Sequence, residues 1–277
     1  MNLLNLELNL FLVVVALYSI SFIFYLVYLV FPQFLGRGRI ASSVLTLGVI
    51  VHIMLIIIRI IQTRHPPFQT LYEALSWFSF SVVIAYLFVE WKRKVRLAGI
   101  FVTAIVIAAS LYAILGLSSV PRPLPPALQS KWFAWHVIAA FSAYAAFVVA
   151  FCIEIAFLLF GSRARRYELT ESAKKLFHRT SYNLILLGFP LLGYGIISGG
   201  AWAEEAWGVY WSWDPKETWS LITWLVYALY LHAKITPRWT TWKASVLVIL
   251  GFICMIFTFL GVNWITQLLN IPSLHAF

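Results

Sequence analysis

The stretch Ala201–Trp224, AWAEEAWGVYWSWDPKETWSLITW, lies between two long apolar segments, and the rest of the chain is interpreted around it. It contains six of the thirteen tryptophans: Trp202, Trp207, Trp211, Trp213, Trp219 and Trp224. It also contains four of the ten acidic residues, Glu204, Glu205, Asp214 and Glu217. Tryptophan is common where helices leave a membrane, but six within one short stretch exceed such a belt. The stretch therefore predicts an aromatic surface for a flat, apolar ligand.

The composition is that of a membrane protein. Of the 277 residues, 62% are hydrophobic and only 11% are charged, whereas a soluble domain is about half apolar and about a quarter charged. The apolar runs are each about 20 residues long, the length that a helix needs to cross a bilayer. They show no period-two alternation, which argues against a barrel and favours helices. We therefore expect an all-α, polytopic membrane helix bundle.

The apolar runs predict about eight transmembrane helices in one integral membrane domain over residues 1–277. Their approximate ranges are 8–31, 40–62, 71–90, 97–117, 132–160, 181–200, 216–235 and 244–262. The first run lacks a preceding basic segment and a small-residue cleavage site, so we expect it to be retained as a span. Cys152 and Cys254 lie inside apolar runs without a C-x-x-C pattern, and they predict neither a disulfide-exchange site nor a zinc site.

The basic residues predict how the chain crosses the membrane. The connections after the first, third, fifth and seventh runs carry 15 Lys and Arg residues, and the remaining chain carries 5. By the positive-inside rule the first group is cytoplasmic, and both termini are extracytoplasmic. The loop 118–131, with its four prolines, and residues 201–220 are then extracytoplasmic, while 161–180 is a cytoplasmic basic linker facing solvent or lipid headgroups. Because the net charge of +10 is spread over short loops, we expect no nucleic-acid partner.

The run Asp214-Pro215-Lys216-Glu217 predicts the start of a helix. An acid at the N-cap, proline at the first helical position and glutamate at the third are the signals of a helix N-terminus. Two interpretations of Asp214 stay open: it is a helix cap only, or it caps the helix and also serves a binding site.

The histidines supply candidate ligands, because an imidazole inside a membrane span is costly unless it is paired or coordinated. His136, at the outer end of its span, and His275, in the outer tail, fall on the same predicted side as the tryptophans. Two neutral imidazoles can take both axial positions of a haem iron. His232 lies about 23 Å along the helix that begins near Lys216 and suggests a second, inner station for the same ligand.

The other histidines have plainer interpretations. His52, near the middle of its span, and His232 can instead be hydrogen-bonded to a neighbouring helix and structural. We expect His65 to be a loop residue and His178 to be exposed in the basic linker.

Several motifs of the sequence resemble those of a known protein family. The run Trp207–Asp214, WGVYWSWD, followed by PKETWSLITW, resembles the WWD motif of haem-handling membrane proteins. That continuation, HVIAAFSAYAAF from His136, HPPFQTLYEAL at 65–75 and the late His275 resemble the CcsA/ResC cytochrome c biogenesis proteins. The likeness extends from the second predicted span to the tail, and its most specific part is the WWD segment, residues 201–220.

The resemblance implies haem (haem b) as the cofactor, held by His136 and His275 at an outer site. There the WWD segment contributes Trp202, Trp207, Trp211, Trp213, Asp214 and Trp219 to binding. It implies an inner site at His232 that is completed by a separate CcsB/ResB-like partner. The family tail usually reads Leu-His-Ser-Tyr, whereas this chain ends SLHAF and keeps the imidazole. Candidates to meet the propionates are Arg59, Arg64, Arg122 or Lys131, and the sequence does not decide among them.

The implied function is haem transport across the membrane and covalent attachment to the C-x-x-C-H motif of an apocytochrome c, as a holocytochrome c synthase subunit. The implied location is a bacterial plasma membrane or a plastid thylakoid membrane. Two alternatives stay open: a chaperone of the CcmC type that only presents haem to a carrier, and a transporter or scaffold that binds no haem.

Overall fold

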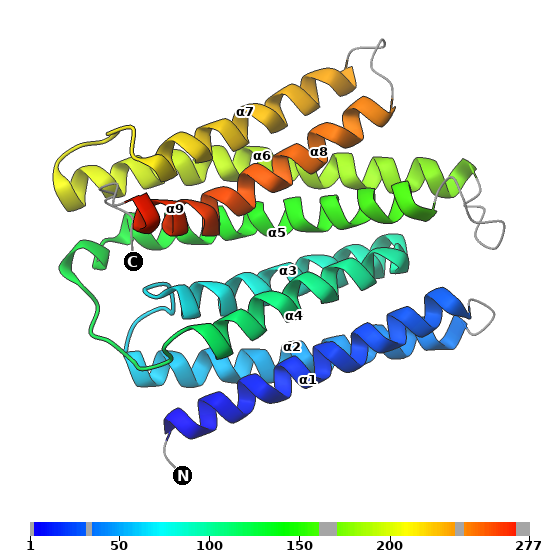
Figure 1. Ribbon diagram of the computed structural model, residues 1–277, viewed down its shortest axis with the longest axis horizontal. Helices are drawn as coiled ribbons and strands as arrows, with labels where there is room; N and C mark the ends of the chain where they lie inside the picture. The colour runs from blue at the N-terminus through cyan, green and yellow to red at the C-terminus, as the bar shows by residue number, and fades with distance from the viewer. Residues whose placement is uncertain (1–2, 32–34, 161–170, 236–240, 270–277) are drawn as a thin grey trace. The chain divides into compact units, whose positions relative to one another are not determined.

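The computed structural model describes residues 3–31, 35–160, 171–235 and 241–269, and these residues are helical apart from turns and loops (Figure 1). The α-helices are α1 (Leu3–Val30), α2 (Leu35–Thr63), α3 (Leu71–Arg93), α4 (Gly99–Gly116), α5 (Lys131–Phe160), α6 (Glu171–Trp207), α7 (Pro215–Ile235), α8 (Thr241–Ile256) and α9 (Val262–Leu269). Short turns of other helix types are η1 (Arg96–Ala98), η2 (Pro126–Leu128) and η3 (Phe257–Gly261). The all-α prediction is confirmed.

The chain is an integral membrane protein. Within the described residues, seven helical segments are long and apolar enough to cross a membrane: Leu3–Val30, Gly38–Thr63, Leu71–Arg93, Arg96–Gly116, Lys131–Phe160, Lys174–Trp207 and Trp242–Thr266. The predicted span that is not among these seven is 216–235, which corresponds to α7; this helix is long enough but carries several Trp, Tyr and charged residues and so has a less apolar composition. The count of eight and the outward placement of both termini stay predictions.

Contacts divide the chain into two compact units. Unit 1 covers 1–124 and 155–177, and unit 2 covers 125–154 and 178–277. The interpretation of residues 1–277 as one domain stays a prediction.

In unit 1, α1 packs along α2, and α4 packs against α1 and α3. A buried charge cluster joins three of these helices: Arg59 Nε donates to Glu73 Oε1 at 2.8 Å, and Arg59 Nη1 lies 3.3 Å from Glu7 Oε2. Glu73 also closes a capping box with Thr70 at the start of α3. Paired charges of this kind are how ionisable side chains are tolerated inside an apolar bundle.

In unit 2, α6 is longer than predicted at both ends. It begins at Glu171, inside the predicted linker 161–180, and it continues to Trp207, so the first part of the WWD segment is helical. Gly208, with φ of +78°, follows its last residue, and Gly208 N donates to Glu204 O at 2.9 Å. Glycine in this left-handed conformation commonly follows the end of a helix.

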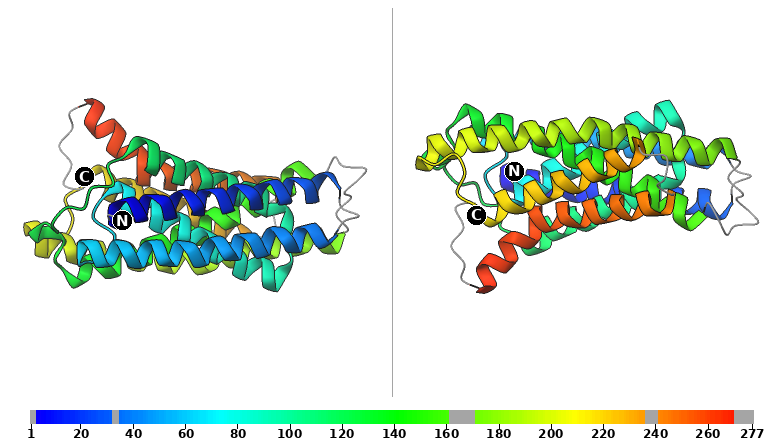
Figure 2. Two further views of the ribbon diagram at one scale, coloured as in Figure 1. Left: turned by 90° about the horizontal axis from the view of Figure 1, so that it is seen from below. Right: turned by 90° about the horizontal axis from the view of Figure 1, so that it is seen from above.

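The last helices of unit 2 bend. After α8 the chain makes one turn of π-helix, η3, and Figure 2 shows α9 leaving the line of α8 at this turn. Such π-turns inside helices are frequent at functional sites. Here the turn brings Thr258 and Phe259 to the wall of a cavity.

Candidate functional site

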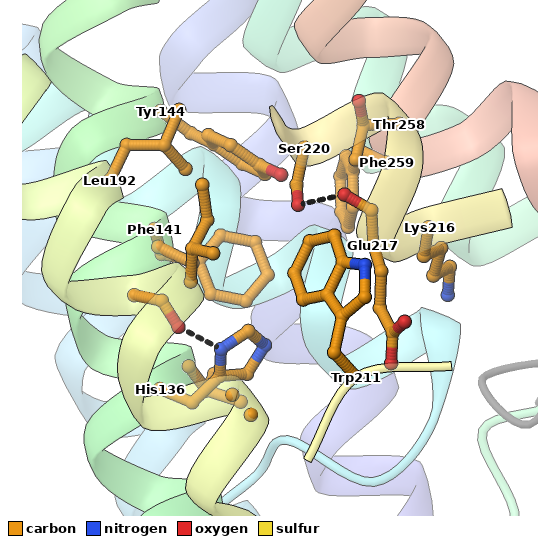
Figure 3. A pocket seen from close by; sticks show the side chains of 16 residues that line it. His136, Phe141, Tyr144, Leu192, Trp211, Lys216, Glu217, Ser220, Thr258 and Phe259 are labelled. Atoms are coloured by element: carbon orange, nitrogen blue, oxygen red, sulfur yellow. Dashed lines mark hydrogen bonds between the residues drawn. The ribbon is translucent and has the colours of Figure 1, made fainter. Parts of the chain in front are cut away.

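Unit 2 contains a cavity of about 150 Å³ between α5, α6, the start of α7 and η3 (Figure 3). Its walls are mostly apolar and aromatic, with a few polar groups at defined places. The residues that line it are His136, Val137, Ala140, Phe141, Tyr144, Leu192, Gly195, Ile196, Gly199, Gly200, Trp211, Lys216, Glu217, Ser220, Thr258 and Phe259. An apolar pocket with a few convergent polar groups is the usual form of a small-molecule site.

His136 is the histidine of this cavity, and its orientation is fixed. Its Nδ1 lies 2.7 Å from the carbonyl oxygen of Gly195 on α6. A carbonyl oxygen only accepts hydrogen bonds, so Nδ1 is the donor in this bond, and in the neutral ring Nε2 then carries the lone pair. Figure 3 shows Nε2 on the side of the ring that faces Trp211. A backbone carbonyl that holds one ring nitrogen while the other is directed into a site is the usual arrangement behind a metal-ligating imidazole.

Trp202 lies beside His136 rather than in the cavity wall. Its indole is 1% exposed and stacks on the imidazole, with ring centroids 6.0 Å apart and planes inclined by 23°. Its Nε1 donates to Ala127 O at 2.7 Å, which ties the connection before α5 to the end of α6. Ser130 Oγ makes a second tie to the same end of α6, by donating to Glu205 at 2.5 Å. Trp202 therefore packs against the imidazole of His136 and restricts its movement.

The start of α7 confirms the predicted helix signal. Asp214 Oδ1 accepts the backbone N–H of Lys216 at 2.9 Å, and Glu217 Oε2 accepts those of Asp214 and Ser212 at 3.2 Å and 2.8 Å. Asp214 is 6% exposed and does not line the cavity, whereas Lys216 and Glu217 do. The cap fixes where α7 begins and so places the polar edge of the cavity.

The tryptophans of the WWD segment do not form one flat surface, which corrects that part of the sequence interpretation. Trp202 and Trp207 meet at 71° on α6, and Trp211 and Trp213 meet at 89° in the connection before α7. Only Trp211 lines the cavity with His136. Consecutive indoles differ in direction because the segment is part helix and part loop.

Trp213 and Trp219 border a second hollow of unit 2, of about 340 Å³, together with Pro215, Thr218, Phe257, Val262, Ile265 and Thr266. Trp213 is 68% exposed and has a φ of +60°. Trp219 packs against Phe257 of η3, with ring centroids 4.3 Å apart. The WWD segment therefore contributes to two neighbouring hollows.

The other two predicted ligands are not brought to the cavity in the described part of the chain. His232 lies near the end of α7, on an exposed face of that helix. At a rise of 1.5 Å per residue it is about 25 Å along the helix from Pro215. His275 lies outside the described residues. The assignment of all three histidines as ligands stays a prediction.

The remaining histidines make contacts that suit structural roles. His52 is fully buried in unit 1, with Tyr18 OH 3.0 Å from Nδ1 and Ser76 Oγ 3.0 Å from Nε2, as the structural interpretation expected. His65 contacts two backbone carbonyl oxygens: Pro66 O of its own loop at 2.9 Å and Arg122 O of the loop 118–131 at 3.4 Å. His178 was expected to be simply exposed, which is wrong: its Nδ1 lies 3.4 Å from Glu154, a buried carboxylate of α5.

Arg59, one of the four candidates for a propionate partner, is already paired with buried acids. Its guanidinium is 3% exposed and is committed to Glu7, Glu73 and the carbonyl oxygen of Ser119, the last at 2.6 Å. Arg64, Arg122 and Lys131 are exposed at the ends of helices or in loops. Lys216 was not among the expected residues, although it lines the cavity.

Sequence reasoning also missed Gly195 and Gly199, which let α6 approach α5. A Cβ at Gly195 would lie 3.4 Å from the backbone nitrogen of Ala140, and one at Gly199 would overlap the imidazole of His136. Two small residues spaced by four are a known signal of close helix packing in membranes, and this signal was present in the sequence.

Comparison with known proteins decides the family. The model of the family described as "Cytochrome C assembly protein" matches residues 68–270. The chain belongs to the cytochrome c assembly protein family. Within it, the chain is 33% identical to the "Cytochrome c biogenesis protein CcsA" of Guillardia theta, over 93% of this chain and 92% of that protein. It is 34% identical to the CcsA of Gloeobacter violaceus, over 88% of this chain and 86% of that protein.

A solved structure shares the fold. The chain superimposes on "Cytochrome c Heme Lyase CcmF" with a TM-score of 0.69 and 17% sequence identity, over 93% of this chain and 46% of that one. At this identity the likeness concerns the fold alone. The expected resemblance to CcsA-type cytochrome c biogenesis proteins is confirmed by the family match and by the identity to the CcsA relatives.

Proposed function

We propose that this cytochrome c assembly protein binds haem in the cavity beside His136, carries haem across the membrane and takes part in its covalent attachment to an apocytochrome c. The single observation that supports this most is the geometry of His136. Its Nδ1 proton is held by Gly195 O at 2.7 Å, so that Nε2 is the nitrogen directed into an aromatic cavity. The names of the CcsA relatives support the same role.

The residues of the cavity suit a haem edge. Phe141, Trp211 and Phe259 offer apolar faces for a porphyrin, and His136 offers an imidazole for the iron. The enclosed volume of about 150 Å³ is below the range of about 300–1,000 Å³ of pockets that surround a drug-sized ligand. A haem held here would therefore keep one edge outside the enclosed part, where an apocytochrome can reach it. Lys216 is the cation on the cavity wall and is our candidate for a propionate partner.

Haem is the cargo and the substrate in this proposal. In thioether formation, each cysteine thiol adds across a vinyl group: a C–S bond forms and the thiol hydrogen passes to the other vinyl carbon. The chain contributes orientation and a high local concentration, which account for much of the rate in reactions that join two positioned groups. His136 holds the iron, the aromatic walls exclude water from the porphyrin face, and the exposed edge admits the two cysteines.

The proposal includes an inner station at His232 and a membrane partner of the CcsB/ResB type. His232 is exposed on α7, as an imidazole shared with another protein would be. In this scheme the partner supplies the second ligand of the inner haem, and His275 supplies the second ligand of the outer one. The WWD segment then faces the extracytoplasmic side, where cytochromes c are completed.

The test is an assembly assay in a bacterial strain without its own attachment system. The chain is expressed with a CcsB-like partner and a reporter apocytochrome, and covalent haem is measured by haem staining after denaturing electrophoresis. We expect attachment with the wild type and its loss with His136→Gly. Haem bound to the purified protein without covalent attachment in the reporter would favour a chaperone that only presents haem. A purified protein without haem, from cells rich in haem, would contradict the proposal.

A further inference from the structure

We propose that Gly199 of α6 is a positioning residue for the haem ligand His136: only glycine at this place lets the imidazole lie against α6 with Nε2 in the cavity. This inference rests on the proposed function. It concerns a glycine of the cavity wall, and its effect is argued to run through the imidazole of His136.

The space beside Gly199 is too small for a side chain while the imidazole of His136 keeps its position. A Cβ built there would lie 2.6 Å from His136 Nδ1 and 2.9 Å from its Cε1. Carbon and nitrogen atoms without a hydrogen bond pack at about 3.5–4.0 Å, so a methyl group and the present imidazole exclude each other. The contact is made by the ring itself, so rotation of a distant flexible group does not relieve it.

Neighbouring residues on α6 restrict the position of the His136 imidazole. Trp202, three residues further along α6, stacks on the imidazole and is itself held by its hydrogen bond to Ala127 O. Gly195, one turn before Gly199, holds Nδ1 through its carbonyl. The ring is therefore kept against one face of α6, and a methyl group on that face would push it away from the helix.

Displacement of the imidazole from α6 would weaken His136 as an iron ligand. When the ring leaves α6, the hydrogen bond from Nδ1 to Gly195 O lengthens or breaks, and the proton is no longer confined to Nδ1. The direction of Nε2 into the cavity is lost with it. Groups that hold a ligand from behind typically contribute about 10- to 100-fold to metal affinity. We expect an effect of this size from a single methyl group that displaces the imidazole from α6.

The same helix offers a matched control. A Cβ at Gly188 would lie 2.6 Å from the ring of Phe147, the same overlap as at Gly199, but Phe147 does not line the cavity. Gly188→Ala and Gly199→Ala thus impose the same steric conflict on the same pair of helices. They differ in which ring must move and in that Gly199 itself lines the cavity, so the double variant with His136→Gly is needed to isolate the effect that runs through the imidazole.

The experiment compares Gly199→Ala, Gly188→Ala, His136→Gly and the double variant His136→Gly/Gly199→Ala, each as the full chain purified in detergent. Haem affinity is measured by titration of added haem and followed by the Soret band, together with the reduced spectrum and the midpoint potential. We expect Gly199→Ala to lower haem affinity by about 10- to 100-fold and to change the reduced spectrum. Gly188→Ala should keep both. The double variant should match His136→Gly, because removal of the ring leaves room for the methyl group.

Each possible result either supports or contradicts the role of Gly199. Wild-type affinity and spectrum in Gly199→Ala overturn the inference, and so does an equal loss in Gly188→Ala, which would indicate general packing. If Gly199→Ala cannot be recovered but the double variant can, the conflict lies with His136 and the inference stands; if neither can be recovered, it falls. A His136→Gly variant with an unchanged spectrum is a different failure, because it removes the proposed function itself.

Discussion

The carboxylate of Glu217 accepts the backbone N–H of Asp214 at 3.2 Å, and this bond closes the N-terminus of α7. The reciprocal bond runs from Lys216 N to Asp214 Oδ1 at 2.9 Å. Each acid thus satisfies a helix N–H group that has no partner within the helix. Because Lys216 and Glu217 also line the cavity beside His136, the cap sets the position of that part of the wall.

Asp214→Asn is expected to change little. Asparagine caps a helix about as well as aspartate, so the free energy of unfolding should stay within about 0.5 kcal/mol, whereas Asp214→Ala should cost about 1 kcal/mol. Thermal unfolding in detergent and bound haem per protein measure the two effects. A folded Asp214→Asn protein that attaches no haem would give the charge of Asp214 a direct role.

Arg59→Met is expected to destabilise unit 1 by about 3–5 kcal/mol, because it leaves the buried carboxylates of Glu7 and Glu73 without their cation. The midpoint of thermal unfolding measures the loss. The control is Arg122→Met, at an exposed side chain, which should stay within about 0.5 kcal/mol. Equal effects of the two changes would refute the assignment of Arg59 to a buried cluster.

The variant His52→Phe tests whether His52 is a structural residue or a haem ligand. Phenylalanine keeps an aromatic ring at this buried site, although a somewhat larger one, but Tyr18 OH and Ser76 Oγ each lose a buried hydrogen-bond partner, at a cost of about 1–3 kcal/mol for each. We expect a lower unfolding temperature and an unchanged absorption spectrum per folded protein. Loss of a haem band from folded His52→Phe protein would make His52 a ligand after all.

His232→Ala tests the relay between the two stations. The side chain is exposed on α7, so the free energy of unfolding should change by no more than about 0.5 kcal/mol. If the inner station supplies the outer one, haem should fall at both, as read from pyridine haemochrome content and the two spectral components of the complex with its partner. Unchanged outer haem in this variant removes the relay from the account.

The regular parts of the fold follow from local signals. Long apolar runs predicted the helices, and Asp214 with Glu217 predicted where α7 begins, because both signals depend on neighbouring residues alone. The extension of α6 to Trp207 was missed, although Gly208 marked its end, since the many tryptophans were interpreted as a loop surface. No local sequence signal of comparable strength marks the π-turn η3. Tertiary packing decides which of its residues reach the cavity wall.

The cavity was predicted only in part. His136 was a candidate because a histidine near the end of a span needs a partner, but the identity of that partner, Gly195 O, depends on how α5 and α6 cross. The directions of Trp211 and Trp213 depend on the backbone of the connection before α7, where Trp213 has a φ of +60°. Tertiary contacts of this kind cannot be read from residue types and spacing.

The most direct test of the central claim, that His136 binds the iron of a haem in this cavity, is the absorption spectrum of the full chain purified in detergent from haem-replete cells. We predict a Soret band that weakens in His136→Gly and returns when imidazole is added, because free imidazole can occupy the space of the missing ring. A Soret band of equal strength and position in the wild type and in His136→Gly would contradict the account.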